Sequence, residues 1–385
     1  MTAARRSRTS SRPERDNVTA HARPGDRPRR HPRGSRGTRP RPRTSERSDP
    51  WHIENVAIPT EPLPAWARDR AAELTGRSLP ESSRVIRDTS EFMAIDRDSV
   101  VGLGGELFLV TGTEREQRFG LAGEPKFWVK RALALGSGSR HILKMVFHER
   151  FRACIGELEI VCVRSAEKEA AVLDLVRGDP RYMSGRSVRD ERGNLVRVID
   201  VIAGETFLSR ILGLPLGHEA YIESVFPGVL AAIAESLLAI ERLHRSGLTH
   251  GDIRNDHIFV EEGSARLRWI DFDLDQDTPA YDVWSVGNLL HCVVAKGFVT
   301  FQDAFEQRPE LATVLREGDA SVFFPFRVMN LGKVFPYIPD ALARVLERFA
   351  VSGTVRYDRV GQVAEDLGAC ASSLRRPGDT TLFRV

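Results

Sequence analysis

The sequence predicts an α+β protein in which a small antiparallel sheet precedes a larger, mainly helical part. Three observations predict this class. Short apolar and β-branched runs, separated by glycine-containing turns, fill residues 99–151. A helical pattern over residues 226–244 carries its apolar side chains on one stripe. After that helix, residues 247–273 form a loop and two short apolar runs that fit a hairpin. Strands first and helices later are typical of the α+β class.

The expected elements follow one another along the chain. The strands of the sheet are Val100–Val101, Leu107–Val110, Phe127–Val129 and His141–Phe147. Residues 165–176 carry apolar side chains at three- and four-residue steps, which predicts a short amphipathic helix. A strand over residues 195–202 then leads into the helical part. We therefore expect the sheet to end near residue 202.

The expected hairpin carries a carboxylate near each of its two ends. Asp252 precedes its first strand, Ile258–Val260, and Asp271 follows its second strand, Leu267–Ile270. A hairpin would bring both carboxylates to one edge. One of them can then hold a metal ion while the other orients a hydroxyl group.

Three motifs around this hairpin resemble those of the protein-kinase superfamily. The loop His250-Gly251-Asp252-Ile253-Arg254-Asn255-Asp256-His257 is similar to the catalytic loop H-R-D-L-x-x-x-N, and Asp271-Phe272-Asp273 is similar to D-F-G. Further on, Asp282 opens a Trp-Ser-x-Gly helix that resembles the one whose aspartate braces the kinase catalytic loop. The resemblance, to bacterial serine/threonine-kinase-like proteins, implies a bilobal protein-kinase-like fold with a small antiparallel β-sheet lobe and a larger helical lobe. It also implies that ATP and Mg²⁺ are bound between the lobes.

The resemblance assigns a role to each matching residue of the loop and the metal segment. Asp252 would align the acceptor hydroxyl, and Arg254 would neutralise charge on the transferred phosphoryl group. Asp271 would hold Mg²⁺. His257 stands where the family has a metal-binding asparagine, and imidazole suits Mg²⁺ poorly, so we expect one magnesium ion rather than two. Asp273 replaces the glycine of D-F-G, and it either adds a carboxylate to the metal site or lies in solvent.

Kinases also carry a lysine on the third strand of the small lobe, which neutralises the inner phosphates of the nucleotide. Lys144, in Ile-Leu-Lys, is the best match, and Lys130 is the alternative. The family pairs this lysine with a glutamate on the following helix. Glu169 is the expected partner, with Glu167 second.

The glycine-rich loop that covers the phosphates in kinases is matched only in part. Gly102 and Gly104 are the expected nucleotide-binding glycines, although Leu107 stands where the third glycine belongs. The run Phe119–Gly123 is the alternative. Ordinary hairpin turns use glycine just as readily, because glycine adopts positive φ angles without steric cost.

The segment after Asp273 departs from the family. Only eight residues separate Asp273 from Asp282, whereas protein kinases insert a much longer activation segment that ends in A-P-E. Gly251 also replaces the family's arginine, and this H-G-D form resembles aminoglycoside-type phosphotransferases. Arg356 matches an arginine whose usual partner, the A-P-E glutamate, is missing. The acceptor is therefore a protein or small-molecule hydroxyl. The alternative to an active kinase is a catalytically impaired pseudokinase that acts as a nucleotide-binding scaffold or regulator.

The amino-acid composition is that of a globular protein without disulfides, structural zinc or a membrane span. The 385 residues are 41% hydrophobic and 28% charged, as in globular proteins. The four cysteines form no CxxC pair, so we expect free thiols, no zinc site and a cytoplasmic location. No apolar run is long enough to span a membrane.

The first fifty residues hold fifteen arginines against five acidic residues and predict a disordered basic tail. Its charge could attract nucleic acid, but we favour a dispensable leader or an upstream extension of the reading frame, and we do not expect nucleic acid as a partner. The expected division is 1–50 tail, 51–96 linker or N-terminal extension, 97–202 small lobe and 203–375 large lobe.

Overall fold

The computed structural model describes residues 61–115, 123–155, 158–276 and 278–374. The basic tail expected over residues 1–50 lies outside the described residues, and so does most of the alternative glycine run Phe119–Gly123. The described part of the chain belongs to one unit that begins at Ala57.

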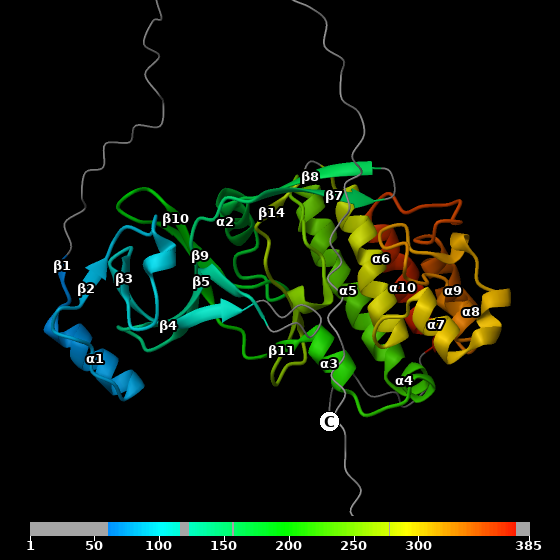
Figure 1. Cartoon of the computed structure of the whole chain (residues 1–385), viewed down its shortest axis with the longest axis horizontal. Helices are drawn as coiled ribbons and strands as arrows, with labels where there is room; N and C mark the ends of the chain where they lie inside the picture. The colour runs from blue at the N-terminus through cyan, green and yellow to red at the C-terminus, as the bar shows by residue number, and fades with distance from the viewer. Residues whose placement is uncertain (1–60, 116–122, 156–157, 277, 375–385) are drawn as a thin grey trace, which may run out of the picture. The chain divides into compact units, whose positions relative to one another are not determined.

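An eight-stranded sheet forms the N-terminal part of this unit, blue to green in Figure 1. Its spatial order is β1-β2-β3-β4-β5-β6-β10-β9, and all neighbours are antiparallel except β2 and β3. The strands are β1 (Glu61–Pro62), β2 (Arg84–Ile86), β3 (Val100–Leu103), β4 (Glu106–Arg115), β5 (Pro125–Ala134), β6 (Arg140–Lys144), β9 (Gly185–Arg189) and β10 (Leu195–Asp200). The antiparallel sheet expected from the sequence is thus confirmed.

The segment expected as a linker or extension over residues 51–96 is part of the sheet from Glu61 onward. Its two strands, β1 and β2, extend the sheet edge, and between them helix α1 (Ala65–Thr75) covers that edge. Ala67 and Ala71 of α1 are fully buried in a small core with Leu109 and Leu135. A short 3₁₀ turn, η1 (Phe92–Ala94), leads into β3. Strands of two or three residues carry no periodicity, which is why the sequence did not predict this continuation.

A second hairpin, which the sequence did not predict, lies in the chain between β6 and β9 of the main sheet. Its strands are β7 (Arg150–Ile155) and β8 (Leu158–Arg164), and β8 leads directly into helix α2 (Ala166–Leu175). Strand β8 also pairs with β14 (Leu274–Asp275), giving a three-stranded sheet of order β14-β8-β7. The chain just before α2 is therefore joined to the chain just after Asp273.

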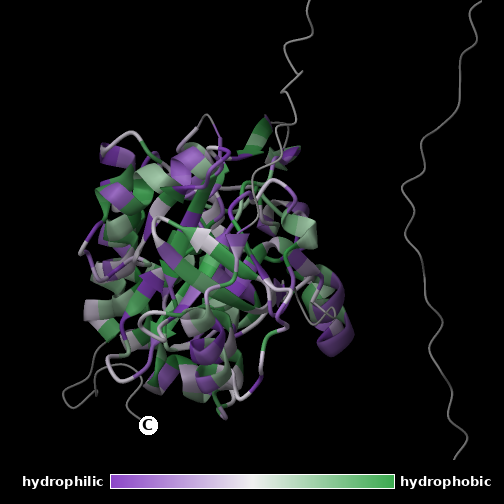
Figure 2. Cartoon of the chain, turned by 90° about the vertical axis from the view of Figure 1, so that its left-hand side faces the viewer, coloured by the Kyte–Doolittle hydropathy of each residue, from purple (hydrophilic) through white to green (hydrophobic). Residues whose placement is uncertain are grey.

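The helical part, green to red in Figure 1, is built around the expected long helix, which the structure confirms as α5 (Phe226–Arg245). Its stripe of apolar side chains is fully buried in the largest core. The other helices are α3 (Phe207–Gly213), α4 (His218–Ser224), α6 (Ala280–Ala295), α7 (Phe301–Gln307), α8 (Leu331–Val334), α9 (Asp340–Glu347) and α10 (Val360–Leu374), with 3₁₀ turns η3 (Pro309–Thr313) and η4 (Glu317–Asp319). Figure 2 shows hydrophobic and hydrophilic residues on the same helices, as expected of helices with one face in a core.

The expected hairpin over residues 258–270 is also present. Strands β12 (Ile258–Glu261) and β13 (Leu267–Trp269) pair antiparallel, and β11 (Gly204–Thr206) adds a third strand. Trp269 is fully buried, and its indole N–H donates to the carbonyl of Ser236 on α5 at 3.0 Å. The hairpin is thereby fixed to the helical core, and with it the residues at its ends.

Among the described helices, none is by itself both long and apolar enough to cross a membrane. Helices α4 and α5 meet that requirement only when taken together, and they are bent by 65° where they join.

Candidate functional site

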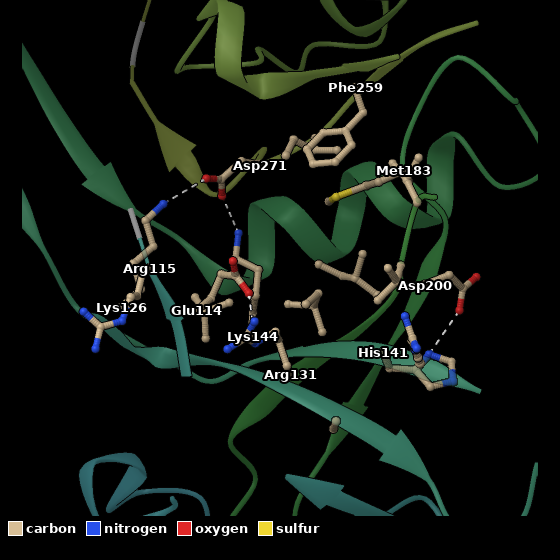
Figure 3. A pocket seen from close by; sticks show the side chains of 18 of the residues that line it. Glu114, Arg115, Lys126, Arg131, His141, Lys144, Met183, Asp200, Phe259 and Asp271 are labelled. Atoms are coloured by element: carbon tan, nitrogen blue, oxygen red, sulfur yellow. Dashed lines mark hydrogen bonds and ion pairs between the residues drawn. The ribbon is translucent and has the colours of Figure 1, made fainter. Parts of the chain in front are cut away.

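A cavity of about 900 Å³ lies between the eight-stranded sheet and the β12–β13 hairpin. Met183 and Phe259 contribute apolar surface, while Asp271, Lys144 and Lys126 lie together on one side of it (Figure 3). Basic side chains outnumber acidic ones in its lining. The basic ones are Arg97, Arg115, Lys126, Arg131, Arg140, Lys144, Arg164 and Arg254, and the acidic ones are Glu114, Asp200, Asp256 and Asp271. A partly apolar cavity with excess positive charge suits a ligand that has both a hydrophobic and an anionic part.

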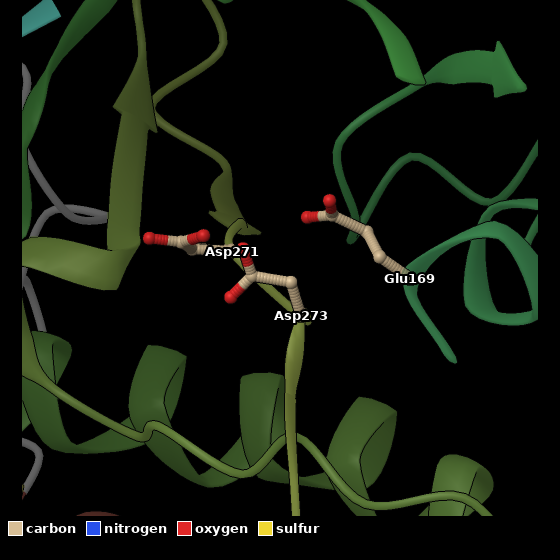
Figure 4. Close-up of side chains that lie close together, drawn as sticks. All are labelled: Glu169, Asp271 and Asp273. Carbon is tan, nitrogen blue, oxygen red and sulfur yellow. The ribbon is translucent and has the colours of Figure 1, made fainter. Parts of the chain in front are cut away.

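Lys144, on β6, lies at the centre of three carboxylates. Its Nζ is 2.7 Å from Glu169 Oε1, 2.5 Å from Asp271 Oδ1 and 3.0 Å from Asp273 Oδ2. Figure 4 shows these three carboxylates converging. Burial would lower the pKa of Lys144, but Asp271, Asp273 and Glu169 outweigh burial and raise it, so the lysine is charged.

The alternative lysine, Lys130, lies on the other side of β5 from the cavity. Its neighbours Val129 and Arg131 line the cavity, whereas Lys130 is buried and donates to Thr113 Oγ1 at 3.2 Å. Successive side chains of a strand point to opposite faces, which accounts for this difference. The structure therefore brings Lys144, and not Lys130, to the site.

Glu169 reaches Lys144 from α2. Its second oxygen accepts from Arg197 Nε on β10 at 3.1 Å, and its first also accepts from the backbone N–H of Phe272 at 3.3 Å. Glu167, the second choice, is exposed on the outer face of the helix. The carboxylate of Glu169 thus links the sheet to the Asp271-Phe272-Asp273 segment.

Asp271 follows β13 and points into the cavity. Its backbone is in the left-handed region, at φ 67°, which is uncommon for aspartate and typical of positions under functional constraint. Burial would raise the pKa of Asp271, but Lys144 and Lys126 hold it well below its usual range. The carboxylate is therefore ionised. Its Oδ2 is 3.6 Å from Lys126 Nζ and 3.4 Å from His257 Nε2.

Of the two interpretations that the sequence allowed for Asp273, the structure excludes the one that places it in solvent. It is 1% exposed, so it does not lie in solvent, and it does not line the cavity. Its Oδ1 is 2.6 Å from Arg164 Nη1, and its Oδ2 is 3.0 Å from Lys144 Nζ. Both oxygens are engaged by cations, and Arg164 comes from the β7–β8 hairpin that the sequence did not predict. Asp273 is therefore an ion-pair partner of both Lys144 and Arg164, and its role as a metal ligand stays a prediction.

The expected phosphate glycines, Gly102 and Gly104, do not reach the cavity, which corrects that prediction. A Cβ on Gly102 would meet Val85 at 2.9 Å, and one on Gly104 would meet Val188 at 3.2 Å. Both therefore serve close packing and a turn at the β3–β4 hairpin. The connection whose flanks do line the cavity is the next one, between Arg115 of β4 and Lys126 of β5. The alternative glycine run falls in that connection.

Asp282, at the start of α6, holds in place the loop His250–His257, which resembles the kinase catalytic loop. This fully buried carboxylate accepts from the backbone N–H groups of His250 at 2.7 Å and Gly251 at 2.8 Å, and it contacts His244 Nε2 at 2.8 Å. Burial would raise the pKa of Asp282, but its hydrogen bond from His244 and the bonds from the loop lower it. An ionised carboxylate here fixes the loop that carries Asp252.

Asp252 lies at the end of this loop and keeps much of its carboxylate free of close partners among the described residues. Burial raises the pKa of Asp252 to about 6, partly opposed by Arg254, whose Nη1 is 3.8 Å away. A carboxylate with a pKa near neutrality can accept a proton and later release it. Arg254 itself donates to both oxygens of Asp256, at 3.1 and 3.0 Å, and to His257 Nε2 at 2.6 Å.

Several residues of the site carry no motif and were missed by sequence reasoning. They are Lys126, Arg164, Lys168 and Arg197. Lys168, on α2, is buried, and its Nζ donates to the carbonyls of His250, at 3.0 Å, and Leu274. Burial lowers the pKa of Lys168. The pairing of β8 with β14 brings Arg164 and Lys168 to the site, whereas Lys126 and Arg197 come from β5 and β10 of the main sheet. The unmatched Arg356 donates to backbone carbonyls of residues 348, 350 and 351 and lies over Trp284.

The residues present fit one magnesium ion better than two. Asp271 supplies a hard oxygen ligand that faces the cavity. The cluster Glu169, Asp271 and Asp273 has carboxylate spacing suitable for a metal, but the Lys144 ammonium already lies within 3.0 Å of all three. A metal ion bound here would contact Asp271 from the cavity side, where this carboxylate lines the cavity.

Lys144 and Asp271 line the cavity, Glu169 contacts Lys144 from behind, and His257 lies between Asp252 and Asp271, an arrangement that resembles a kinase site. No family model matches the chain. Curated proteins similar to it include the putative ribosomal protein S6 kinase alpha-2 of Caenorhabditis elegans, 28% identical over 109 residues, which are 28% of this chain and 13% of that protein. The death-associated protein kinase dapk-1 of Caenorhabditis elegans is 20% identical over 197 residues, 44% of this chain and 13% of that protein. The CBL-interacting protein kinase 22 of Oryza sativa subsp. japonica is 28% identical over 177 residues, 37% of this chain and 38% of that protein.

Among solved structures, the PknI kinase domain of Mycobacterium tuberculosis (C20A mutant) is 14% identical. The match has a TM-score of 0.42 and covers 72% of this chain and 99% of that domain. The aligned regions span well under half the length of the three curated relatives. The three curated proteins that match parts of this chain are protein kinases, and the motifs and the site geometry resemble those of that superfamily.

Proposed function

We propose that this protein is an ATP-dependent phosphotransferase that moves the γ-phosphoryl group of ATP to a hydroxyl group of an acceptor. The observation that carries this proposal is the convergence of Lys144, Glu169 and Asp271 at the positively charged side of the cavity. Asp252 lies in the loop that precedes the β12–β13 hairpin. The buried Asp282 holds this loop through the backbone N–H groups just before Asp252.

The cavity has an apolar part that suits the base of ATP and a charged part that suits its phosphates. The base would lie on the apolar lining, which includes Ile142, Ile199, Phe259 and Ile270. The inner phosphates would meet Lys144, whose charge is secured by its carboxylate neighbours. Magnesium at Asp271 would neutralise charge on the outer phosphates and orient them. Positioning and charge neutralisation account for most of the acceleration in phosphoryl transfer.

Asp252 is the proposed proton acceptor. The acceptor hydroxyl forms a bond to the γ-phosphorus, the bond from that phosphorus to the bridging oxygen of ADP breaks, and the hydroxyl proton passes to Asp252. Because burial raises the pKa of Asp252 to about 6, the group is ionised at neutral pH yet basic enough to take this proton.

The short connection after Asp273 bears on the class of acceptor. It forms β14 and enters α6 at Ala280, so it has no length for the peptide platform of protein kinases. A small-molecule hydroxyl is therefore as well supported as a serine or threonine side chain. Incubation with γ-labelled ATP tests both, since the label moves to the protein itself, to added polypeptides, to added aminoglycosides and polyols, or to water.

A nucleotide-binding scaffold without transfer activity is the second candidate. It is favoured by His257, whose two ring nitrogens both have protein partners, so that it offers no free ligand for metal. ATP that raises Tm without any label transfer supports the scaffold. Label transfer that disappears in Asp252→Asn, while the ATP-dependent rise in Tm persists, supports the enzyme. If ATP changes neither Tm nor label, both candidates fail.

A further inference from the structure

We propose that the Arg254 guanidinium, held by His257 and Asp256, takes the place of a second metal ion at the outer phosphates, so that this site binds ATP with a single divalent cation. The inference rests on the proposed function, because it concerns how the same site holds the nucleotide. It goes beyond it by giving His257 and Arg254 one joint role.

The hydrogen bonds of His257 determine which of its nitrogens carries the proton. Nδ1 is 2.8 Å from the carbonyl oxygen of Asp252, which can only accept, so Nδ1 must donate. Nε2 is 2.6 Å from Arg254 Nη2, which can only donate, so Nε2 must accept. The single lone pair of the neutral ring is therefore used by the guanidinium. No lone pair is left for a metal ion.

The imidazole itself is held rigidly by buried surroundings. It is 3% exposed, and its ring lies 6.2 Å from that of His250 with the planes almost parallel. A protonated ring would point an N–H at the guanidinium, which the contact with Arg254 opposes in any case.

Arg254 is fixed from a second side by Asp256. Nε and Nη2 of Arg254 donate to the two oxygens of this carboxylate at 3.1 and 3.0 Å, a bidentate pair that sets the plane of the guanidinium. Arg254, Asp256, His257 and Asp271 all line the cavity. Nε2 of His257 is also 3.4 Å from Asp271 Oδ2, so the ring adjoins both the guanidinium and the expected metal ligand.

The Arg254 charge lies in the same cavity as Asp271, where the outer phosphates would bind under the proposed function. An arginine is always protonated and offers several N–H donors, so it can neutralise phosphate charge without a metal. The family asparagine at this position binds the second Mg²⁺ through an oxygen. Here the imidazole of His257 stands in place of that oxygen, and its free nitrogen accepts a hydrogen bond from Arg254. The guanidinium of Arg254 therefore lies beside the position of the family asparagine. His257 is thus a positioning residue that acts through Arg254.

The test counts metal ions rather than activity. Mn²⁺ binding is measured by electron paramagnetic resonance on the full chain saturated with a non-hydrolysable ATP analogue. We expect one Mn²⁺ per chain in the natural protein. His257→Asn replaces the imidazole by an amide that can turn its oxygen to the metal, and we expect two Mn²⁺ per chain.

A second variant guards against a folding defect in His257→Asn. Arg254→Met keeps the length of the side chain and removes its charge, and we expect affinity for the analogue to fall about tenfold or more at saturating Mn²⁺. Arg254→Lys should recover part of this loss. Arg266→Met, at an exposed arginine of the hairpin turn, is the matched control and should leave affinity unchanged.

The outcomes separate the two proposals. Two Mn²⁺ ions in the natural protein, or unchanged analogue affinity in Arg254→Met, would overturn this inference while leaving the phosphotransferase proposal standing. One ion in a folded His257→Asn variant would also overturn it. Failure of the analogue to bind at all would overturn the proposed function itself.

Discussion

At position 251 the backbone, rather than the chemistry of the site, selects the residue. Gly251 has φ +91°, and a Cβ placed on it would lie 1.8 Å from the carbonyl oxygen of Leu274. That carbonyl belongs to β14, which is held by β8. The arginine of the kinase H-R-D motif therefore cannot occupy this position while β14 stays in place. The H-G-D form follows from the packing of the segment after Asp273.

This argument predicts a large difference between two glycines of the same loop. Gly247 also has a positive φ, +75°, but nothing lies within 4 Å of its Cβ position. Gly247→Ala should cost about 1–2 kcal/mol, the strain of the left-handed conformation. Gly251→Ala carries the same strain and a backbone clash, so we expect it to cost at least ~2 kcal/mol more. Urea unfolding of both variants measures this, and equal losses would show that β14 does not press on the loop.

The ionised form of Asp252 that the proposed reaction needs lowers the free energy of unfolding. Its folded pKa of about 6 exceeds its ordinary value of 3.8, so the folded protein holds this proton more tightly than the unfolded chain. Its contribution to the free energy of unfolding is therefore greatest below pH 3.8 and is lost as pH rises through 6. Asp252→Asn avoids that loss. At pH 7.5 we expect the variant to be more stable by up to about 3 kcal/mol, and inactive in phosphoryl transfer.

The measurement is the difference in free energy of unfolding between Asp252→Asn and the natural chain, followed from pH 4 to pH 8. It should grow mainly between pH 4 and 6 and then level off. Asp174→Asn, at an exposed carboxylate of α2, serves as the control and should show no such step. A difference that stays flat across this range would mean that burial does not set the protonation of Asp252.

Among the elements, α2 is joined to the segment after Asp271 by contacts from its first turn. The backbone N–H of Ser165 donates to the carbonyl of Asp273 at 2.6 Å, and Glu169 accepts from the backbone N–H of Phe272. Lys168 adds bonds to the carbonyls of His250 and Leu274. Together with the pairing of β8 and β14, these bonds hold Glu169 against Lys144 by structure alone. No phosphorylated loop is needed to place the helix.

We predict that Lys168→Met loosens this attachment. The substitution leaves two buried carbonyls without their donor, which costs about 1–3 kcal/mol in the free energy of unfolding. Amide hydrogen exchange in α2 should quicken, while exchange in α10 should change little. Glu167→Gln, one residue earlier and exposed, should stay within about 0.5 kcal/mol of the natural chain. A Lys168→Met protein as stable as this control would remove Lys168 from the attachment.

For the molecule as a whole, the sequence predicted those parts whose chemistry is local. The hairpin and the catalytic-loop match were predicted because residues 243–282 contain the motifs that define them, including Asp282, which holds the loop. Lys144 and Glu169 were placed by resemblance, and the structure brings both to Asp271. The helical stripe of α5 was predicted by its periodicity.

The parts that were missed depend on contacts between distant segments. Strand β14 has two residues and exists only because β8, more than a hundred residues earlier, pairs with it. The ion pair between Asp273 and Arg164 follows from that pairing, so Asp273 alone gave no indication of it. Gly102 and Gly104 were misplaced because a hairpin glycine and a phosphate-loop glycine are the same residue in a sequence.

The N-terminal extension provides the last prediction, since it tests whether the fold begins near residue 57 or at the expected lobe boundary of 97. Residues 61–96 bury Leu63, Ala67, Ala71 and Val85 against Val100, Leu109 and Leu135 of the main sheet. Burial of each large apolar side chain is worth about 1.5–3 kcal/mol, and a whole domain is stable by only about 5–15 kcal/mol.

A chain that starts at residue 97 should therefore aggregate or melt far below a chain that starts at residue 57. A single-residue comparison checks the same contact within the full chain. Ala67→Glu places a charge in this core and should lower Tm sharply, whereas Ala65→Glu, on the exposed side of α1, should leave Tm nearly unchanged. If the shorter chain melts within a few degrees of the longer one, residues 61–96 do not belong to the folding unit. In that case the lobe boundary expected from the sequence would be the correct one.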